Sequence, residues 1–114
     1  MIVCAPITPN PESGSQIDPR WGRANWVALA EVKDDEILSW REIEVSWDRL
    51  HDEGTHGSHH ARIVKFLKEN QVEAIVADHM GDGMVRMLET MKIPVFYNAV
   101  GDAHSAIVKA IGNS

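Results

Sequence analysis

The chain has 114 residues, of which 44% are apolar and 25% charged, and its formal net charge is −6. Length and composition of this kind are typical of one globular domain with an apolar core, and we expect residues 1–114 to form a single domain. The negative charge argues against nucleic acid as a partner, because phosphate binding needs clustered basic residues. It argues equally against binding to anionic membranes.

The sequence also bears on the compartment of the protein. The single cysteine, Cys4, cannot form an internal disulfide, so nothing indicates an oxidising environment. The N-terminal residues lack the basic segment and the length of a signal peptide. No apolar run approaches the roughly 18 residues that a membrane helix needs. We therefore expect a cytoplasmic protein with no membrane contact.

The first half of the chain predicts three strands. Met1–Ala5 is a short apolar run stopped by Pro6, which is typical of a strand buried on both faces. The segment that follows, up to Arg23, is rich in proline and glycine and predicts a long ordered loop. Asn25–Val32 and Ile37–Trp47 are separated by a polar turn and predict a hairpin. The polar face of its second strand suits the edge of a sheet.

The second half of the chain alternates helices and strands. Apolar spacing predicts helices over Ser58–Glu69, Asp82–Met91 and Ala103–Ile111, and strands over Val72–Ala77 and Pro94–Tyr97. The element order is then β-β-β-α-β-α-β-α. Right-handed crossovers turn this order into an α/β fold, a mixed five-stranded sheet flanked by helices.

Four segments, taken together and in this order, resemble the dinitrogenase iron–molybdenum cofactor biosynthesis family, the NifX-like type also found at the C-terminus of NifB. They are the strand ending at Ala5-Pro6, the stretch Trp21–Ala24, the loop Gly54–Gly57, and the unit Val72–Leu88 followed by Ile93–Val95. The resemblance covers essentially the whole chain. It implies a ribonuclease H-like fold and, by analogy with nitrogen-fixation proteins, the binding of iron–sulfur or iron–molybdenum cluster precursors.

One stretch departs from the pattern of that family. Its members usually carry a His-Phe-Gly-Arg stretch where this chain has Arg20-Trp21-Gly22-Arg23. The histidine of that loop is therefore absent, which puts a ligand role for the loop in doubt. A group of histidines further along the chain could compensate.

That group consists of His56, His59 and His60, at the start of the first predicted helix. With Ile63 they fall at i, i+3, i+4 and i+7, so they share one helix face. Imidazoles one turn apart can bind the same metal ion, and we expect these three to be metal ligands. The alternative is that they act as helix caps and hydrogen-bond partners in a polar loop.

A second candidate binding element is the turn containing Gly81, Asp82 and Gly83, between a predicted strand and a predicted helix. Backbone N–H groups and the helix dipole can hold an anion at such a turn. Arg23 could add its fork of donors to the same anionic cofactor. The alternatives are a tight turn that simply needs glycine, and a structural ion pair for Arg23.

Several single residues accompany these groups. His79 and His104 follow predicted strands and could approach the same site, and Met80 could offer a thioether. Trp21 lies in the long loop, where it could cover a ligand. Cys4, in the first strand, is expected to be a buried core residue.

The sequence offers no catalytic arrangement. Two-metal nuclease chemistry needs converging carboxylates, yet the first strand has none and Asp78 stands alone. We therefore expect no enzyme. The leading hypothesis is a carrier for a metal cluster or metal cofactor, with a protein partner in cofactor assembly. The alternative is a non-catalytic interaction or regulatory module of the same fold, without metal.

Overall fold

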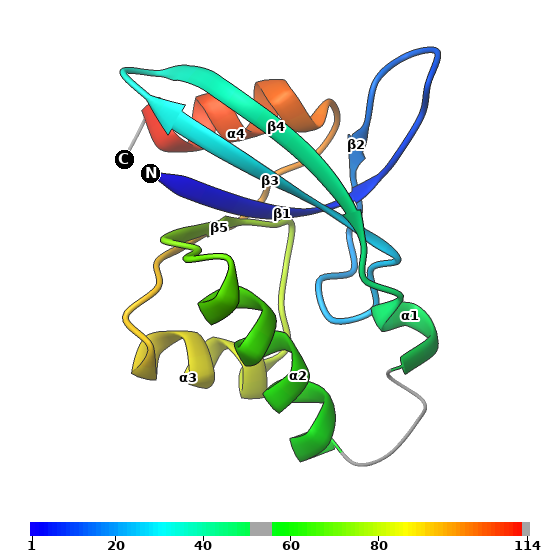
Figure 1. The fold of residues 1–114 in the computed structure, drawn as a ribbon, viewed down its shortest axis with the longest axis vertical. Helices are drawn as coiled ribbons and strands as arrows, with labels where there is room; N and C mark the ends of the chain where they lie inside the picture. The colour runs from blue at the N-terminus through cyan, green and yellow to red at the C-terminus, as the bar shows by residue number, and fades with distance from the viewer. Residues whose placement is uncertain (51–55, 113–114) are drawn as a thin grey trace.

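The computed structural model describes residues 1–50 and 56–112 (Figure 1). Its strands are β1 (Ile2–Thr8), β2 (Gln16–Ile17), β3 (Trp26–Lys33), β4 (Glu36–Glu44), β5 (Ala74–Val76) and β6 (Val95–Phe96). Its helices are α1 (Trp47–Leu50), α2 (His56–Glu69), α3 (Asp82–Thr90) and α4 (Ala103–Gly112). Within the described ranges, no helix has both the length and the apolar character needed to span a membrane.

The strands form one mixed sheet in the order β4-β3-β1-β5-β6, with β2 paired to β1 outside this path. β1 runs antiparallel to β3 and β2 and parallel to β5, which in turn runs parallel to β6. The predicted mixed α/β architecture is confirmed, whereas the predicted number of five strands is wrong. The sixth, β2, lies in the segment expected to be a loop, and two residues are too few to leave a periodic pattern.

The first strand does not stop at Pro6, as the sequence predicted, but continues to Thr8. Pro6 pairs with Val27 of β3, and its carbonyl oxygen accepts a hydrogen bond from the Asp18 backbone N–H at 2.9 Å. The N and C=O of one residue in an antiparallel strand face the same neighbour. The missing N–H of Pro6 therefore faces the Asp18 side, and the ladder with β3 stays intact.

The hairpin of β3 and β4 is present, but its second strand ends earlier than predicted. β4 stops at Glu44, and Trp47 begins the short helix α1 instead of ending the strand. Ser46 has a φ of 54°, in the left-handed region that extended backbone does not use. The alternation of apolar and polar residues continues to Trp47 in the sequence. This tryptophan is indeed buried, but it belongs to helix α1 and not to the strand. As predicted, β4 lies at the edge of the sheet.

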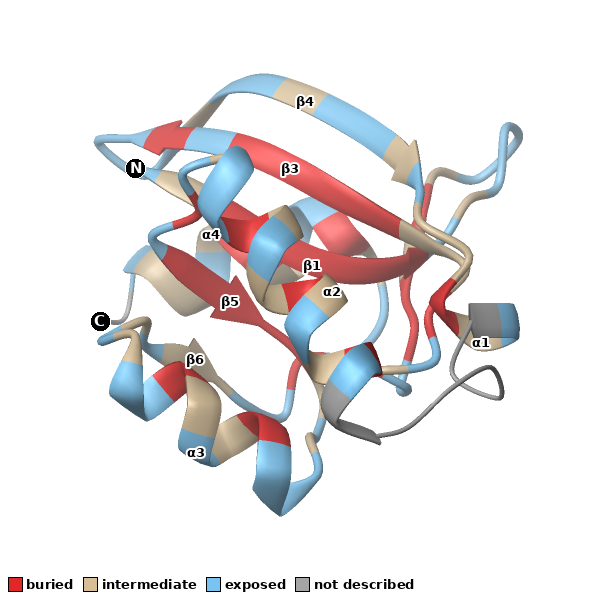
Figure 2. Ribbon diagram, turned by 60° about the horizontal axis from the view of Figure 1, so that its bottom comes forward, coloured by how far each residue is buried: buried red, intermediate tan, exposed pale blue. Residues whose placement is uncertain are grey.

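Helices cover both faces of the sheet (Figure 1). Ile63 of α2 and Leu88 of α3 pack in one apolar cluster with Cys4, while Ile107 of α4 packs in a second cluster with Val3. Figure 2 shows the consequence: β1, β3 and β5 are almost wholly buried, and each helix is buried along one side only. Adjacent residues of β1 thus face opposite layers.

Cys4 yields a test of this burial. Its side chain has no exposed surface, and desolvation raises the pKa of the thiol well above its ordinary value. At pH 8 the folded thiol is therefore both protonated and inaccessible, whereas the unfolded thiol, with a pKa near 8.5, is partly ionised.

We expect an aromatic disulfide reagent at pH 8 to label the native protein at least about 100-fold more slowly than the guanidinium-unfolded protein, because labelling requires opening of the sheet. Absorbance of the released thiolate measures both rates. Comparable rates in the two states would contradict the placement of Cys4.

Candidate functional site

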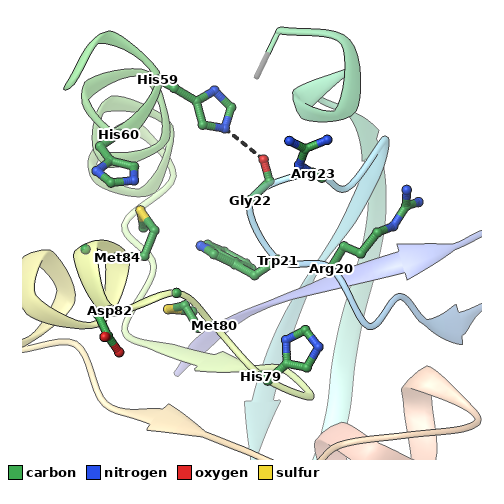
Figure 3. Close-up of a pocket in the computed structure, with 12 residues that line it drawn as sticks. Arg20, Trp21, Gly22, Arg23, His59, His60, His79, Met80, Asp82 and Met84 are labelled. Carbon is green, nitrogen blue, oxygen red and sulfur yellow. Dashed lines mark hydrogen bonds between the residues drawn. The ribbon is translucent and has the colours of Figure 1, made fainter. Parts of the chain in front are cut away.

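Three segments that are distant in sequence border one pocket of about 470 Å³ (Figure 3). They are the loop between β2 and β3, the first turns of α2, and the turn that leads from β5 into α3. The lining residues are Arg20, Trp21, Gly22, Arg23, His59, His60, His79, Met80, Gly81, Asp82, Gly83 and Met84. The pocket lies beyond the carboxyl end of β5, the edge at which open α/β sheets bind ligands.

The structure brings together most of the residues selected from the sequence. Arg23, His59, His60 and the Gly81–Gly83 turn all line this pocket. The side chain of His56, from which α2 starts, lies outside the described part of the chain.

His79 and His104, the two single histidines expected near the site, lie in different places. His79 lines the pocket and forms an isolated parallel bridge with Arg20, which brings the loop and the turn together. His104 does not line it. Its ring stacks on Trp40 of β4 with the ring centroids 3.7 Å apart.

His59 connects α2 to the loop. Its side chain is buried, and Nε2 donates to the carbonyl oxygen of Gly22 at 2.8 Å (Figure 3). With Nε2 protonated, Nδ1 is left as the acceptor, and it lies 3.4 Å from a guanidinium nitrogen of Arg62. Ligation of a metal by His59 would therefore require the loss of one of these contacts.

His60 lies one residue on and packs against the start of α3. A Cβ built at Gly83 would lie 2.8 Å from Cε1 of His60, closer than real Cβ atoms approach another atom. Glycine at this position therefore makes room for the imidazole. The contact places His60 over the helix terminus that the sequence marked as an anion site.

The N-terminus of α3 opens onto the same pocket. Gly81 precedes the helix, and no side chain caps the backbone N–H groups of its first turn. Such N–H groups and the helix dipole favour an anion. Asp82 carries a negative charge here, and Figure 3 shows its carboxylate on the side of the turn away from Trp21.

The lining contains two arginines and one aspartate, Asp82, although the chain as a whole carries −6. Arg20 forms an ion pair with Asp18, which its Nε contacts at 3.2 Å, and the hydrogen bonds and charge of Asp18 raise the pKa of Arg20. Figure 3 shows the guanidinium groups of Arg20 and Arg23 on the side of the pocket away from α3. Asp18 therefore offsets part of the positive charge of the lining.

The described side chains do not form a compact metal site. Among them, and they do not include the side chain of His56, no group of three or more His, Cys, Asp and Glu lies close enough together to hold a metal ion. The thiol of Cys4 is buried in the core of the sheet, away from the pocket lining. What the pocket offers instead is guanidinium, imidazole, thioether and backbone N–H groups.

Sequence reasoning missed part of the lining. No binding role was predicted for Arg20, which stands where the family usually has histidine, or for Met84. Met84 is 4% exposed and lies on the apolar side of α3, where a methionine is ordinary core. No local signal distinguishes these two residues from structural ones.

Comparison with known proteins identifies related sequences and folds. The model of the family described as dinitrogenase iron-molybdenum cofactor matches residues 1–113. No curated protein matches the chain.

Several solved structures share the fold. A candidate NifB protein from Thermotoga has a TM-score of 0.71 and 18% identity over 99% of this chain and 88% of that one. The apo orange protein from Desulfovibrio gigas has a TM-score of 0.77 and 13% identity over 98% of this chain and 88% of that one. A candidate dinitrogenase from Methanocaldococcus jannaschii has a TM-score of 0.67 and 18% identity over 99% of this chain and 89% of that one. At these identities the likeness shows the fold alone.

The close approach of Gly83 and His60 leads to a prediction with a matched control in the same turn. Gly83→Ala places a methyl group where the imidazole lies, so we expect the His60 ring to move while the protein stays folded. Gly81→Ala adds the same methyl group where no described atom lies within 4 Å. NMR spectra of the His60 ring protons should therefore change strongly in the first variant and little in the second. Equal changes in both would contradict the contact.

Proposed function

The chain belongs to the dinitrogenase iron–molybdenum cofactor family, and we propose that it is a carrier for a metal cluster or metal cofactor, held in the pocket beside α2 and α3. One observation carries this proposal. Segments separated by tens of residues, each selected from the sequence for its own chemistry, border the same pocket. In this proposal residues 1–114 act as a single domain.

The pocket chemistry favours a cargo that brings its own ligands. An anionic iron–sulfur or iron–molybdenum cluster is attracted by the arginines and by the N–H groups of α3. With no cysteine thiolate in the lining, the protein contributes few direct bonds to metal. A cargo held mainly by charge and hydrogen bonds can be passed on, as a carrier requires.

The individual residues then have distinct roles. His60, together with His56, would ligate an exposed metal of the cargo, and Arg23 would neutralise part of its charge. The Gly81–Gly83 turn would hold an anionic edge, with Asp82 directed outward. His59 would position the loop through Gly22 and could ligate only by giving up a present contact.

The role is proposed to be non-catalytic and to take place in the cytoplasm. A carrier needs a donor and an acceptor of its cargo, so a protein partner in cofactor assembly is part of the proposal. The pocket is lined in part by loops, which suits transfer by direct contact between proteins.

The competing hypothesis is an interaction or regulatory module that binds no metal. It is favoured by the absence, in the described part of the chain, of a compact group of three classical metal-binding side chains. It treats the histidines as structural, in keeping with the contacts of the His59 ring with Gly22 and Arg62.

A binding experiment separates the two hypotheses. We expect untagged protein to bind a synthetic iron–sulfur cluster with thiolate ligands in the absence of oxygen, measured by absorbance titration and by the metal content after gel filtration. The double variant His56→Ala with His60→Ala should bind at least about tenfold more weakly.

His104→Ala is the matched control, because this histidine stacks on Trp40 away from the pocket. Its affinity should stay within about twofold of wild type. Cluster binding by the wild type with equal affinity in the double variant would overturn the role of the two histidines as ligands. No cluster bound by the wild type would favour the interaction module.

A further inference from the structure

We propose that Trp21 determines which ligand this pocket accepts: its indole Nε1–H donates a hydrogen bond to an anion that presents sulfide groups. The inference rests on the proposed function, since it names an atom that the cargo must satisfy. It concerns a donor that neither the family match nor the histidine pattern identifies.

The observation is an unsatisfied donor at the wall of the pocket. Trp21 is 2% exposed and lines the pocket, yet its Nε1 has no hydrogen-bond acceptor among the described residues. Figure 3 shows that the nitrogen is at the end of the ring turned toward Met80 and Met84. Buried N–H groups of this kind nearly always have a partner, so an unpaired one at a pocket indicates a missing acceptor.

The ring is fixed in this orientation by aromatic packing. Trp21 meets Trp47 edge-on with the ring centroids 5.2 Å apart, and Trp47 meets Phe66 in the same way at 5.6 Å. Turning the indole to find another acceptor would break these contacts. The direction of the donor is therefore fixed, while the nitrogen itself is covered and becomes accessible only when neighbouring side chains move. By contrast, Nε1 of Trp40 donates to Glu42 at 3.0 Å.

A second, independent set of donors faces the same space. The N–H groups at the start of α3, which no side chain caps, border the pocket from another side. Donors that converge in this way match a ligand with several acceptor atoms and a negative charge.

The neighbours of the indole nitrogen favour sulfur as the acceptor. Thioether side chains are apolar, polarizable and flexible, so Met80 and Met84 can move aside and then contact a soft, weakly hydrated anion. A strongly hydrated oxyanion would lose its water at this wall without equal compensation. The geometry therefore points to a sulfide-bearing anion over an oxyanion of the same charge.

Tetrathiomolybdate and molybdate form a matched pair of probes, since both are tetrahedral dianions and differ in their sulfur and oxygen atoms. We expect wild-type protein to bind tetrathiomolybdate at least about tenfold more tightly than molybdate in calorimetric titrations. Trp21→Phe should weaken tetrathiomolybdate binding by about tenfold. Trp40→Phe, which removes an N–H that already has a partner, should change it less than about twofold.

Two further measurements keep the result independent of the stability of that variant. Replacement of Trp21 by 3-benzothienylalanine keeps the ring size and removes only the N–H, and should weaken binding as Phe does. In the wild type, the indole proton of Trp21 should move downfield in NMR spectra on addition of tetrathiomolybdate.

The outcomes separate this inference from the proposed function. Tetrathiomolybdate binding that is equally tight without the Trp21 N–H overturns the role of Trp21 and leaves the carrier proposal standing. Molybdate binding as tight as that of tetrathiomolybdate overturns the selection for sulfide. No binding of either anion by the wild type overturns this inference, and the titration with the iron–sulfur cluster then decides the carrier proposal separately.

Discussion

The hydrogen bond from His59 Nε2 to the carbonyl oxygen of Gly22 joins two segments 37 residues apart, and the candidate site depends on it. On one side it fixes the loop that carries Trp21 and Arg23. On the other it fixes the first turns of α2, where His60 packs over Gly83 of α3. Because the histidine is buried, loss of this bond would leave a carbonyl group unpaired. The loop between β2 and β3, the start of α2 and the turn into α3 would then no longer be held in their relative positions.

Under the proposed function, the same arrangement would let an acidic protein bind an anion. The start of α3 borders the pocket, an indole N–H without a described acceptor lies in its wall, and the carboxylate of Asp82 is turned away from Trp21. The only thiol of the chain is buried in the sheet. A carrier of the proposed kind would hold a cargo that arrives with its own ligands and leaves again.

The sequence predicted the parts of the molecule that local patterns determine. The apolar runs of β1, β3 and β5 indicated buried strands, and the glycine turn after β5 indicated the opening of α3. The pairing of β2 with β1, and the tolerance of Pro6 within β1, were missed because both depend on which neighbour each backbone group meets.

The candidate site also divides into features set by local sequence patterns and features set by contacts in the folded chain. The positions of His60, Arg23 and the glycine turn could be inferred from spacing and residue type. The contacts of His59 with Gly22 and of the indole of Trp21 with Trp47 could not, because they join segments whose mutual placement exists only in the folded chain.

The most direct test of the central claim is a crystal structure of the protein loaded without oxygen with a synthetic iron–sulfur cluster, with data collected at the iron absorption edge. The account predicts an anomalous-scattering peak in the pocket, bordered by Trp21, His60 and Gly83. A peak elsewhere, such as the second hollow lined by Tyr97 and Lys109, or no peak in crystals grown from loaded protein, would contradict it.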